Sequence, residues 1–368
     1  MKIRRFEVEG LNDRVDFAFD LHDDVNIFTG VNGSGKTTAL KLAWYLISGN
    51  TIRVRTEIKF QRCRLVTDSF DVNLVRHGSR IRFSFKTESG EYSSFFDEQE
   101  VDSDGDVISD GEDFLRDLIR VESRQSIYFP TFRRIEGGYS ISAARRGRTS
   151  FGLQIPTSTD SSIGTQLDQL SREMSYGSHK FVCAVSTEDI AALLTQRYAQ
   201  ISEGVNKKYT EFSADILQNI RGWERGGGDA AELLRRIQET ANEVDSFRET
   251  ALRPTNVLSQ LVSQMFAYQG VKLKSLALGD AAKAIDSDVL SAGEKQMLSF
   301  LVYNAFATDT PIFIDEPELS LHPDWQRRMF PTLLGQQATN QFIISTHSPF
   351  IYSQYADKEL RINRELGE

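Results

Sequence analysis

The sequence predicts an α/β protein whose sheet-forming regions flank a helical segment, and three patterns lead to this prediction. Apolar strands alternate with helices over residues 271–368, which is typical of a parallel sheet covered by helices. Residues 1–160 contain period-two runs with turn pairs such as His77-Gly78, which indicate antiparallel hairpins within a mixed-sheet lobe. The three-to-four spacing of amphipathic helices dominates residues 161–270. We therefore expect three parts with these boundaries.

Length and composition limit the class of protein. The 368 residues suffice for two or three domains, and 40% hydrophobic with 26% charged residues is typical of globular chains. Two cysteines, Cys63 and Cys183, are too few for a disulfide framework or a metal cluster, which fits a reducing cytoplasm. No apolar run of 18 residues occurs, so we expect no membrane segment.

The net charge of −9 comes from one stretch of the chain. Residues 97–113 contain nine acidic residues and no basic one, and the remainder is balanced. Four aspartates within this stretch have a superficial calcium-loop spacing. However, Val107 stands where the sharp turn requires glycine, and Asp113 replaces the closing glutamate. We predict a flexible acidic loop; whether it mimics DNA or shields a basic region stays open.

The elements of the first part follow from its periodicity. Strands are expected at 2–9, 14–19 and 25–29. A helix at 36–47 should end at Gly49. Apolar and polar residues then alternate from 52 to 96, which predicts further strands. A short helix near 112–120 and a strand at 126–130 should follow.

The middle part begins with a loop rich in Gly, Ser, Thr and Arg at 137–164. Its clearest helix lies between a GGGD start and Pro254, with apolar residues at three-to-four spacing. That helix of about 24 residues would be ~36 Å long at 1.5 Å per residue. We expect the helical insert to be short. The last part should contain helices at 293–307 and 323–336 and strands at 311–314 and 342–344.

A glycine-rich loop between a predicted strand and a predicted helix is the strongest functional signal. The segment GVNGSGKTT fits the phosphate-loop pattern G-x-x-x-x-G-K-[ST]. Glycines let backbone N–H groups close around phosphate oxygens, and the helix N-terminus adds partial positive charge. Lys36 should reach the β and γ phosphates, and the Thr37 hydroxyl should ligate Mg²⁺. The predicted binding residues are Gly30, Asn32, Gly33, Ser34, Gly35, Lys36, Thr37 and Thr38.

An acidic pair follows the apolar strand of PIFIDEPE. Asp315 should lie at the carboxyl end of that strand and serve as the Mg²⁺ partner of the phosphate loop. Glu316 points elsewhere and is the candidate general base that orients water for attack on the γ phosphate. The alternative is a surface acidic pair that closes a core strand.

Two further segments are candidates for the same site. In LSAGEKQ, Ser291 and Glu294 have the spacing of a capping box, which by itself indicates only the start of a helix. Gly293 in the first turn permits close backbone approach, so this helix end could also hold an anion. His347 follows another apolar strand in FIISTHSP, although a lone histidine is usually structural.

In this order and spacing, the four segments resemble one family, the ABC-class ATPases, and within it the RecF, SMC and OLD-like branch. The resemblance covers the first 50 residues and 285–350. DEPELSLHP at 315–323 is similar to the Walker B and D-loop of OLD-like and defence-system ATPases. FPTFRRIEGG at 129–138 is similar to a stretch of ATPases associated with Septu and retron anti-phage systems.

The resemblance implies an ATPase head that works as a head-to-tail homodimer with ATP and Mg²⁺ between the subunits. Ser291, Gly293 and Glu294 would contact the ATP held by the partner, Glu316 would be the catalytic base, and His347 would be the switch histidine on the γ phosphate. Assembly beyond the dimer stays open.

Departures from the family pattern limit the resemblance. The family's Q-loop glutamine should fall near 125–136, and only Gln125 is present there, before the strand. The chain between Lys36 and Ser291 also has no room for the long coiled-coil arms of SMC proteins. OLD nucleases carry a nuclease domain after the ATPase, whereas 21 residues follow His347 here. We therefore expect a separately encoded effector, a nuclease or toxin, in anti-phage defence.

A basic window at 124–148 is a candidate phosphate-binding region, for nucleic acid or nucleotide, with a solvated loop as the alternative. Its arginines, opposed by one acid, Glu136, are Arg124, Arg133, Arg134, Arg145, Arg146 and Arg148. Other functions stay open: a RecF-like DNA-repair ATPase and a scaffold that binds ATP without hydrolysis. The SLHP-type D-loop disfavours a transporter subunit.

Overall fold

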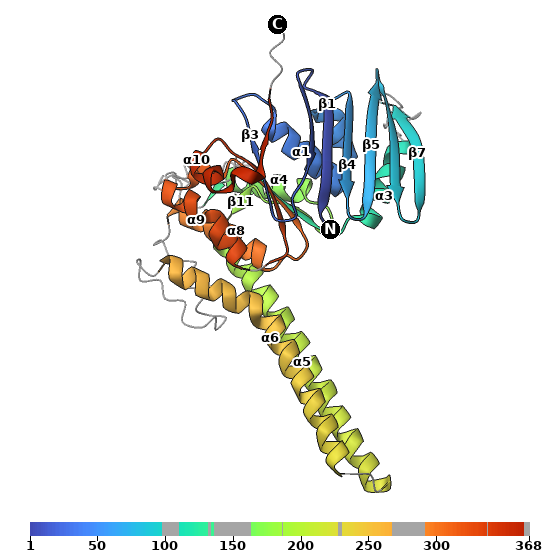
Figure 1. Ribbon diagram of the computed structural model, residues 1–368, viewed down its shortest axis with the longest axis vertical. Helices are drawn as coiled ribbons and strands as arrows, with labels where there is room; N and C mark the ends of the chain where they lie inside the picture. Colours follow the sequence, from blue (N-terminus) through green and yellow to red (C-terminus); the bar gives the residue numbers. More distant parts are fainter. Residues whose placement is uncertain are drawn as a thin grey trace, which may run out of the picture. The chain divides into compact units, whose positions relative to one another are not determined.

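The computed structural model describes residues 1–97, 110–131, 134–135, 163–185, 187–226, 230–266, 291–336 and 338–363 (Figure 1). The chain forms two compact units: Met1–Val185 with Ala307–Glu368, and Ser186–Phe306. The first unit contains two six-stranded sheets, and the second contains long helices. The predicted α/β class is confirmed.

One sheet of the first unit is parallel throughout. Its central strands β3, β8, β12 and β13 are buried along their whole length, as expected for strands covered on both faces. Because parallel strands end at the same edge, the segments that follow them meet there. In spatial order the strands are β10 (His179–Phe181), β8 (Ser126–Phe129), β12 (Pro311–Asp315), β13 (Gln341–Ser345), β3 (Val25–Thr29) and β14 (Glu359–Arg361).

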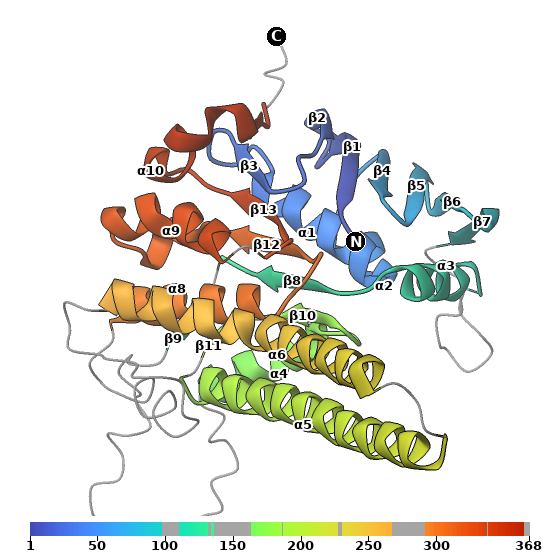
Figure 2. The same cartoon turned by 60° about the horizontal axis from the view of Figure 1, so that its bottom comes forward.

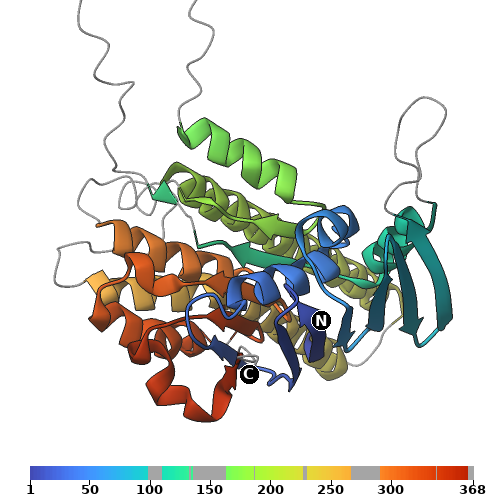
Figure 3. The ribbon, with the colours of Figure 1, turned by 90° about the horizontal axis from the view of Figure 1, so that it is seen from above.

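The other sheet is antiparallel and is built from the hairpins predicted in the first part. Seen from above, its outer strands lie beside helix α3 (Asp110–Glu122) (Figure 3). In spatial order the strands are β2 (Val15–Asp20), β1 (Ile3–Leu11), β4 (Arg62–Thr67), β5 (Phe70–His77), β6 (Arg80–Thr87) and β7 (Gly90–Asp97).

Helix α1 (Lys36–Ser48) lies between the two sheets (Figure 2). Ten of its thirteen residues are buried, and Trp44 and Tyr45 are among the largest fully buried side chains. The helix ends at Gly49, as predicted, and this residue has the left-handed φ of 66° that favours glycine. Packing on both sides fixes the direction in which the N-terminus of α1 points.

Residues 51–57 form a short helix, α2 (Thr51–Glu57), where the sequence predicted the start of the strand region. The alternating β-branched residues of TIRVRTE suggested a strand, but the buried positions are Thr51 and Val54, which are three apart. The buried ion pair between Arg55 and Glu112 of α3 stabilises the helical form. Tertiary contacts therefore outweigh the local propensity.

Several shorter elements complete the first unit. The predicted loop at 137–164 lies outside the described residues except where α4 begins. The elements are α4 (Ile163–Met174), the two-stranded parallel sheet of β9 (Arg134–Ile135) and β11 (Ala184–Val185), the 3₁₀ turns η3 (Pro317–Ser320) and η4 (Ser353–Lys358), and the helices α9 (Pro323–Gly335) and α10 (Pro349–Tyr352).

The second unit contains a pair of helices longer than the sequence predicted. Helices α5 (Thr187–Gly226) and α6 (Ala230–Phe266) have 40 and 37 residues and lie side by side (Figure 1). The expected end at Pro254 was wrong, because α6 continues through this residue to Phe266. Leu258 just beyond it is buried, and tertiary packing of this kind works against the ~3 kcal/mol cost of an internal proline. A further described helix of this unit is α8 (Ala292–Ala305).

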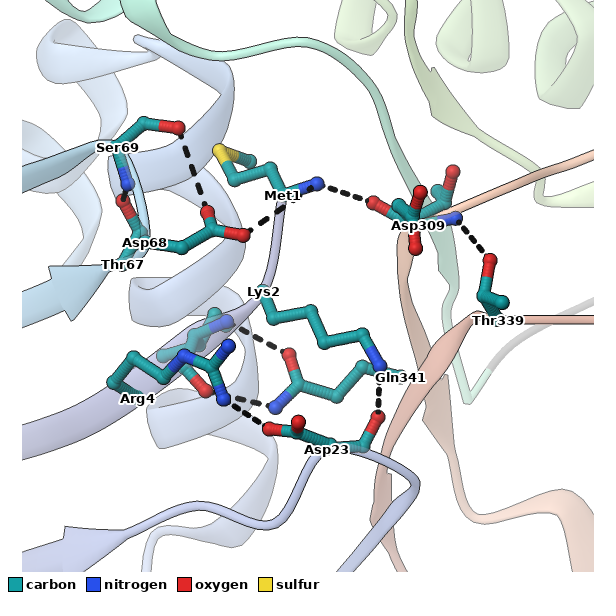
Figure 4. Close-up of polar contacts among 12 residues, drawn as sticks. Met1, Lys2, Arg4, Asp23, Thr67, Asp68, Ser69, Asp309, Thr339 and Gln341 are labelled. Carbon is teal, nitrogen blue, oxygen red and sulfur yellow. Dashed lines mark hydrogen bonds and ion pairs between the residues drawn. The ribbon is translucent and has the colours of Figure 1, made fainter.

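The two sheets are joined at one end by the buried side chain of Gln341 (Figure 4). Its Oε1 accepts the Ile3 N–H at 2.8 Å, and its Nε2 donates to the carbonyls of Ile3 and His22, each at 2.8 Å. Nearby, the Met1 amino group donates to the Asp309 carbonyl at 2.6 Å. One amide of β13 therefore bonds both backbone groups of Ile3 in β1 and the carbonyl of His22, between β2 and β3.

Replacing Gln341 by Leu should lower the free energy of unfolding by about 2 to 4 kcal/mol, because buried backbone groups lose their partners. Urea unfolding of the two proteins measures the difference. The matched control is Lys2→Ala, which removes an exposed hydrogen bond to Asp23 beside the same strand. We expect the control to change stability by less than about 0.5 kcal/mol; an equal effect of both substitutions would contradict the assignment.

A second buried polar cluster lies at the start of β10. The His179 ring is held between two hydroxyls, with Ser123 Oγ at 3.0 Å from Nε2 and Ser126 Oγ at 2.8 Å from Nδ1. Burial, assisted by the nearby Arg120 charge, lowers the pKa of His179 to about 4. The imidazole is therefore neutral at pH 7 in the folded protein.

This shift predicts a pH-dependent stability. An unfolded histidine has a pKa near 6.5, so below that pH the unfolded state binds a proton that the folded state does not bind until the pH falls to about 4. The free energy of unfolding should fall by up to about 3 kcal/mol from His179 as the pH is lowered from about 6.5 to about 4. Chemical unfolding at several pH values measures the slope. His179→Gln should flatten it and the exposed His77→Gln should not; parallel slopes in all three proteins would refute the assignment.

Candidate functional site

The predicted phosphate loop connects β3 to the N-terminus of α1, as the sequence analysis expected. Three of its glycines have positive φ: Gly30 at 148°, Gly33 at 75° and Gly35 at 91°. A Cβ on Gly30 would lie 2.4 Å from the Ile362 carbonyl oxygen and 2.7 Å from Ser34 Oγ. The strand β14, which precedes Ile362, therefore closes the base of the loop and leaves no room for a side chain there.

The loop carries a buried ammonium group. Lys36 Nζ donates to the carbonyls of Gly30 and Val31 at 3.1 and 3.2 Å, and the residue is 4% exposed. Burial lowers the pKa of Lys36, while the carboxylates of Glu316, Asp315 and Glu318 act in the opposite direction. The amine thus points back onto its own loop, and three nearby carboxylates stabilise its positive charge.

The loop residues fit an anionic phosphate group. Ser34 Oγ is buried and has no hydrogen-bond partner among the described residues, and no side chain caps the N-terminus of α1. Both features leave polar groups for a ligand to satisfy. Asn32 and Gly33 are exposed at the tip of the loop, and Thr38 Oγ1 lies 3.5 Å from Asn12 Nδ2.

Asp315 lies at the end of β12 and is fully buried. Thr37 Oγ1 donates to its Oδ1 at 3.0 Å, so the structure brings the two predicted metal-binding residues together. The hydroxyls of Ser345 and Thr131 also donate to this carboxylate. Thr37 and Asp315 supply the oxygen ligands that Mg²⁺ prefers.

Sequence reasoning missed Thr131 and Ser345. Both stand at the carboxyl end of a parallel strand, Ser345 as the last residue of β13 and Thr131 two residues beyond β8. That position was the available signal, because these strands lie next to β12 in the sheet. Gln125, the one glutamine in the window where the family's metal-contacting glutamine was expected, stands at the opposite end of β8 and donates to Thr310 Oγ1.

Glu316 has a left-handed backbone, with φ 46° and ψ 61°, which costs a non-glycine residue about 1 to 3 kcal/mol. Its N–H donates to the Ser345 carbonyl at 2.9 Å. Burial raises the pKa of Glu316, and the neighbouring Asp315 and Glu318 carboxylates add to the shift. A raised pKa suits a carboxylate that accepts a proton during a reaction.

His347 lies beside this carboxylate, with Nε2 at 3.8 Å from Glu316 Oε1. Its backbone N–H donates to Glu318 Oε1 at 2.6 Å. Glu318 was not predicted as a site residue, although it follows Glu316 by two positions in DEPE. The structure therefore assembles Lys36, Thr37, Asp315, Glu316 and His347 around one edge of the parallel sheet.

Ser291, Gly293 and Glu294 of the LSAGEKQ segment belong to the second unit. Ser291 caps α8, and the capping box is complete: Ser291 N–H donates to Glu294 Oε2 at 2.8 Å, and Glu294 N–H donates to Ser291 Oγ at 3.4 Å. The predicted helix start is confirmed. Ser291 is exposed, whereas the Glu294 carboxylate is buried and used within its own helix.

Most of the two charged loops lies outside the described residues. This applies to the acidic residues 98–109, with the possible calcium spacing, and to the arginines at 133, 145, 146 and 148. The end of the acidic stretch is helical, because α3 begins at Asp110. Within the described part of the chain, no cluster of three or more acidic, histidine or cysteine side chains could hold a metal ion. No described helix has the length and apolar character needed to span a bilayer.

The glycine loop, the buried lysine and the hydroxyl–carboxylate pair define a P-loop protein of the ABC-like ATPase class. The family model described as "AAA domain, putative AbiEii toxin, Type IV TA system" matches residues 25–353, which is most of the chain. The chain therefore belongs to this family. Membership confirms the resemblance to ABC-like ATPases that the motifs indicated.

A curated relative comes from Vibrio cholerae serotype O1 biovar El Tor, "Retron Vc95 probable ATPase". It is 38% identical over 184 residues, covering 45% of this chain. The aligned region spans 35% of that relative's length, about a third of the protein.

Two solved structures are similar over most of their length. The Smc head domain bound to the C-terminal domain of ScpA, from Pyrococcus furiosus, covers 96% of this chain and 91% of its own, with 11% identity and a TM-score of 0.38. RecF from the RecFOR pathway covers 99% and 98%, with 10% identity and a TM-score of 0.34.

Replacing Gly30 by Ala should weaken nucleotide binding at least about tenfold, which corresponds to 1.4 kcal/mol. The new Cβ would force the loop away from Ile362 and Ser34. Titration with a fluorescent ATP analogue measures the affinity. In the control Gly335→Ala, the added Cβ meets nothing within 4 Å, so the affinity should not change. Wild-type affinity in Gly30→Ala would show that this loop does not hold the phosphates.

Proposed function

We propose that this protein binds ATP with Mg²⁺ and hydrolyses it to ADP and phosphate. One observation carries the proposal: the phosphate loop, the Thr37–Asp315 pair and the Glu316–His347 pair lie at the same edge of the parallel sheet. These are the groups that phosphoryl transfer to water requires, namely a phosphate cradle, a metal-binding pair and a base. The family assignment supports the same class of reaction.

Each residue has a defined part in this reaction. Lys36 and the loop amides hold the β and γ phosphates, which would draw Nζ away from the carbonyls of Gly30 and Val31. Mg²⁺, held through Thr37 and Asp315, supplies positive charge that offsets the charge on the phosphate oxygens. Glu316 accepts a proton from the attacking water, and His347 donates a hydrogen bond to the γ phosphate.

The proposal includes a head-to-tail homodimer with ATP between the subunits. In this arrangement Ser291 and Gly293 of one chain contact the γ phosphate bound by the other, and Glu294 supports that contact. Ser291 is exposed at the start of α8, and its hydroxyl donates to Glu294 Oε2 at 2.7 Å, so a phosphate would have to replace that bond; the Glu294 carboxylate would act by holding the cap. ATP binding would then stabilise the dimer, because the phosphates are neutralised only when both subunits contribute.

We further propose that this cycle controls a separately encoded effector, a nuclease or a toxin, in anti-phage defence in the cytoplasm. The support is the toxin–antitoxin description of the family and the retron relative. Nucleic acid is a second possible ligand, for which Arg124 and the following arginines are the candidates. The alternatives are a RecF-like DNA-repair ATPase and a scaffold that binds ATP without hydrolysis.

Replacing Glu316 by Gln should lower phosphate release at least about 100-fold, because the amide cannot accept the proton from water. ATP binding should persist, and the ATP-bound dimer should accumulate. Phosphate release and light scattering with and without ATP measure these effects. The matched control is Asp324→Asn, an exposed carboxylate at the start of α9, which should leave phosphate release unchanged.

The outcomes separate the alternatives. Equal activity of wild type and Glu316→Gln would show that Glu316 is not the base. ATP binding by wild type without any phosphate release would favour the scaffold. Undiminished ATP binding by Lys36→Ala would refute the site itself.

A further inference from the structure

A buried glutamine of α9 links the two segments that carry the proposed catalytic pair. Gln326 is 8% exposed and lies in the first turns of the helix. Its Nε2 donates to the Leu321 carbonyl at 2.7 Å and to the Glu318 carbonyl at 3.4 Å. Its Oε1 accepts a hydrogen bond from the Ser348 hydroxyl. One side-chain amide therefore connects the turn after Glu316 to the segment that contains His347.

Glu318 makes a second link between the same two segments, through its Oε1 and the His347 N–H. Ser348 is fixed in turn, because its N–H donates to Thr346 Oγ1 and its Oγ caps α10 by accepting the Phe350 N–H at 3.2 Å. The segment of His347 is thus held on both sides of the histidine. Neither link involves the side chain of Glu316 or the imidazole.

The start of α9 is capped by another residue, so Gln326 is not needed to cap the helix. His322 is the N-cap residue, and its ring accepts the Asp324 N–H. Gln326 instead directs its amide to the residues before the helix and to Ser348. Burying an amide in this way is favourable only while both of its ends have partners.

We propose that Gln326 is a positioning residue that sets the distance between His347 and Glu316. This inference rests on the proposed ATP hydrolysis for its catalytic consequence. A shift of the turn Pro317–Ser320 would therefore also shift His347, because Gln326 and Glu318 connect the two segments. The 3.8 Å separation of the His347 imidazole from the Glu316 carboxylate is the quantity that the link maintains.

The first experiment measures ATP hydrolysis by Gln326→Met, which keeps the length of the side chain and removes its hydrogen bonds. We expect kcat to fall about tenfold with KM for ATP within about twofold, since the geometry of the reacting groups changes and binding does not. The matched control is Gln336→Met, a buried glutamine at the other end of the same helix, which should retain kcat. Gln326→Glu replaces the Nε2 donor by an oxygen that faces the carbonyls of Leu321 and Glu318, so it should lose at least as much kcat as Gln326→Met although it keeps an acceptor for Ser348.

A double variant tests whether Gln326 acts through the histidine. In a His347→Ala background, Gln326→Met should lower kcat no further, because the group that it positions is gone. An equal further loss in both backgrounds would overturn the proposal and indicate a general structural role.

A second measurement does not depend on hydrolysis and keeps the inference separate from the proposed function. Amide hydrogen exchange of Gln326→Met without nucleotide should be faster than wild type in both 317–321 and 346–350, and unchanged there in Gln336→Met. Faster exchange confined to α9, or to one of the two segments, would overturn the link. If wild type released no phosphate, the proposed function would fail, while the exchange result would still decide whether Gln326 joins the segments.

Discussion

The site is organised around one buried carboxylate. Asp315 is fully removed from solvent, and a carboxylate in that position is stable only if its oxygens are hydrogen-bonded. Hydroxyls from three different elements meet this requirement: Thr37 from α1, Ser345 from β13 and Thr131 from the segment after β8. Because the buried carboxylate needs all of these hydrogen bonds, they hold the phosphate loop, two strand ends and the acidic turn in one place.

The parallel sheet makes that constraint possible. Asp315 pairs with Ser345 in the register of β12 and β13, and Ile314 pairs with Phe129 of β8, just before the segment of Thr131. The strands are contributed by segments far apart in the chain, yet their carboxyl ends coincide. Helix α1, buried between the sheets, then delivers Lys36 and Thr37 to the same edge.

The sequence predicted those residues of the site that stand in strong local patterns. The phosphate loop has an almost unambiguous spacing, and Asp315, Glu316 and His347 each follow an apolar strand. Thr131 and Ser345 were not predicted, because a hydroxyl after a strand has no spacing of its own and its role depends on the neighbouring strand. Glu318 in the turn Pro317–Ser320 and Gln326 in α9 were not predicted either, because their partners His347 and Ser348 are distant in the sequence. The length of α6 was missed for a similar reason, since tertiary packing decides whether a helix continues through a proline.

The charges of the site explain why a cation should accompany the phosphates. Asp315, Glu316 and Glu318 all exert their charge on the Lys36 ammonium, so among the described residues around Lys36 the acids outnumber the bases. A polyphosphate alone would add to this excess. Mg²⁺ bound through Thr37 and Asp315 would offset this imbalance where the phosphates lie. Burial raises the pKa of Glu316, and the neighbouring acids add to that shift. Binding of metal and nucleotide should therefore be coupled, because each reduces the electrostatic cost of the other.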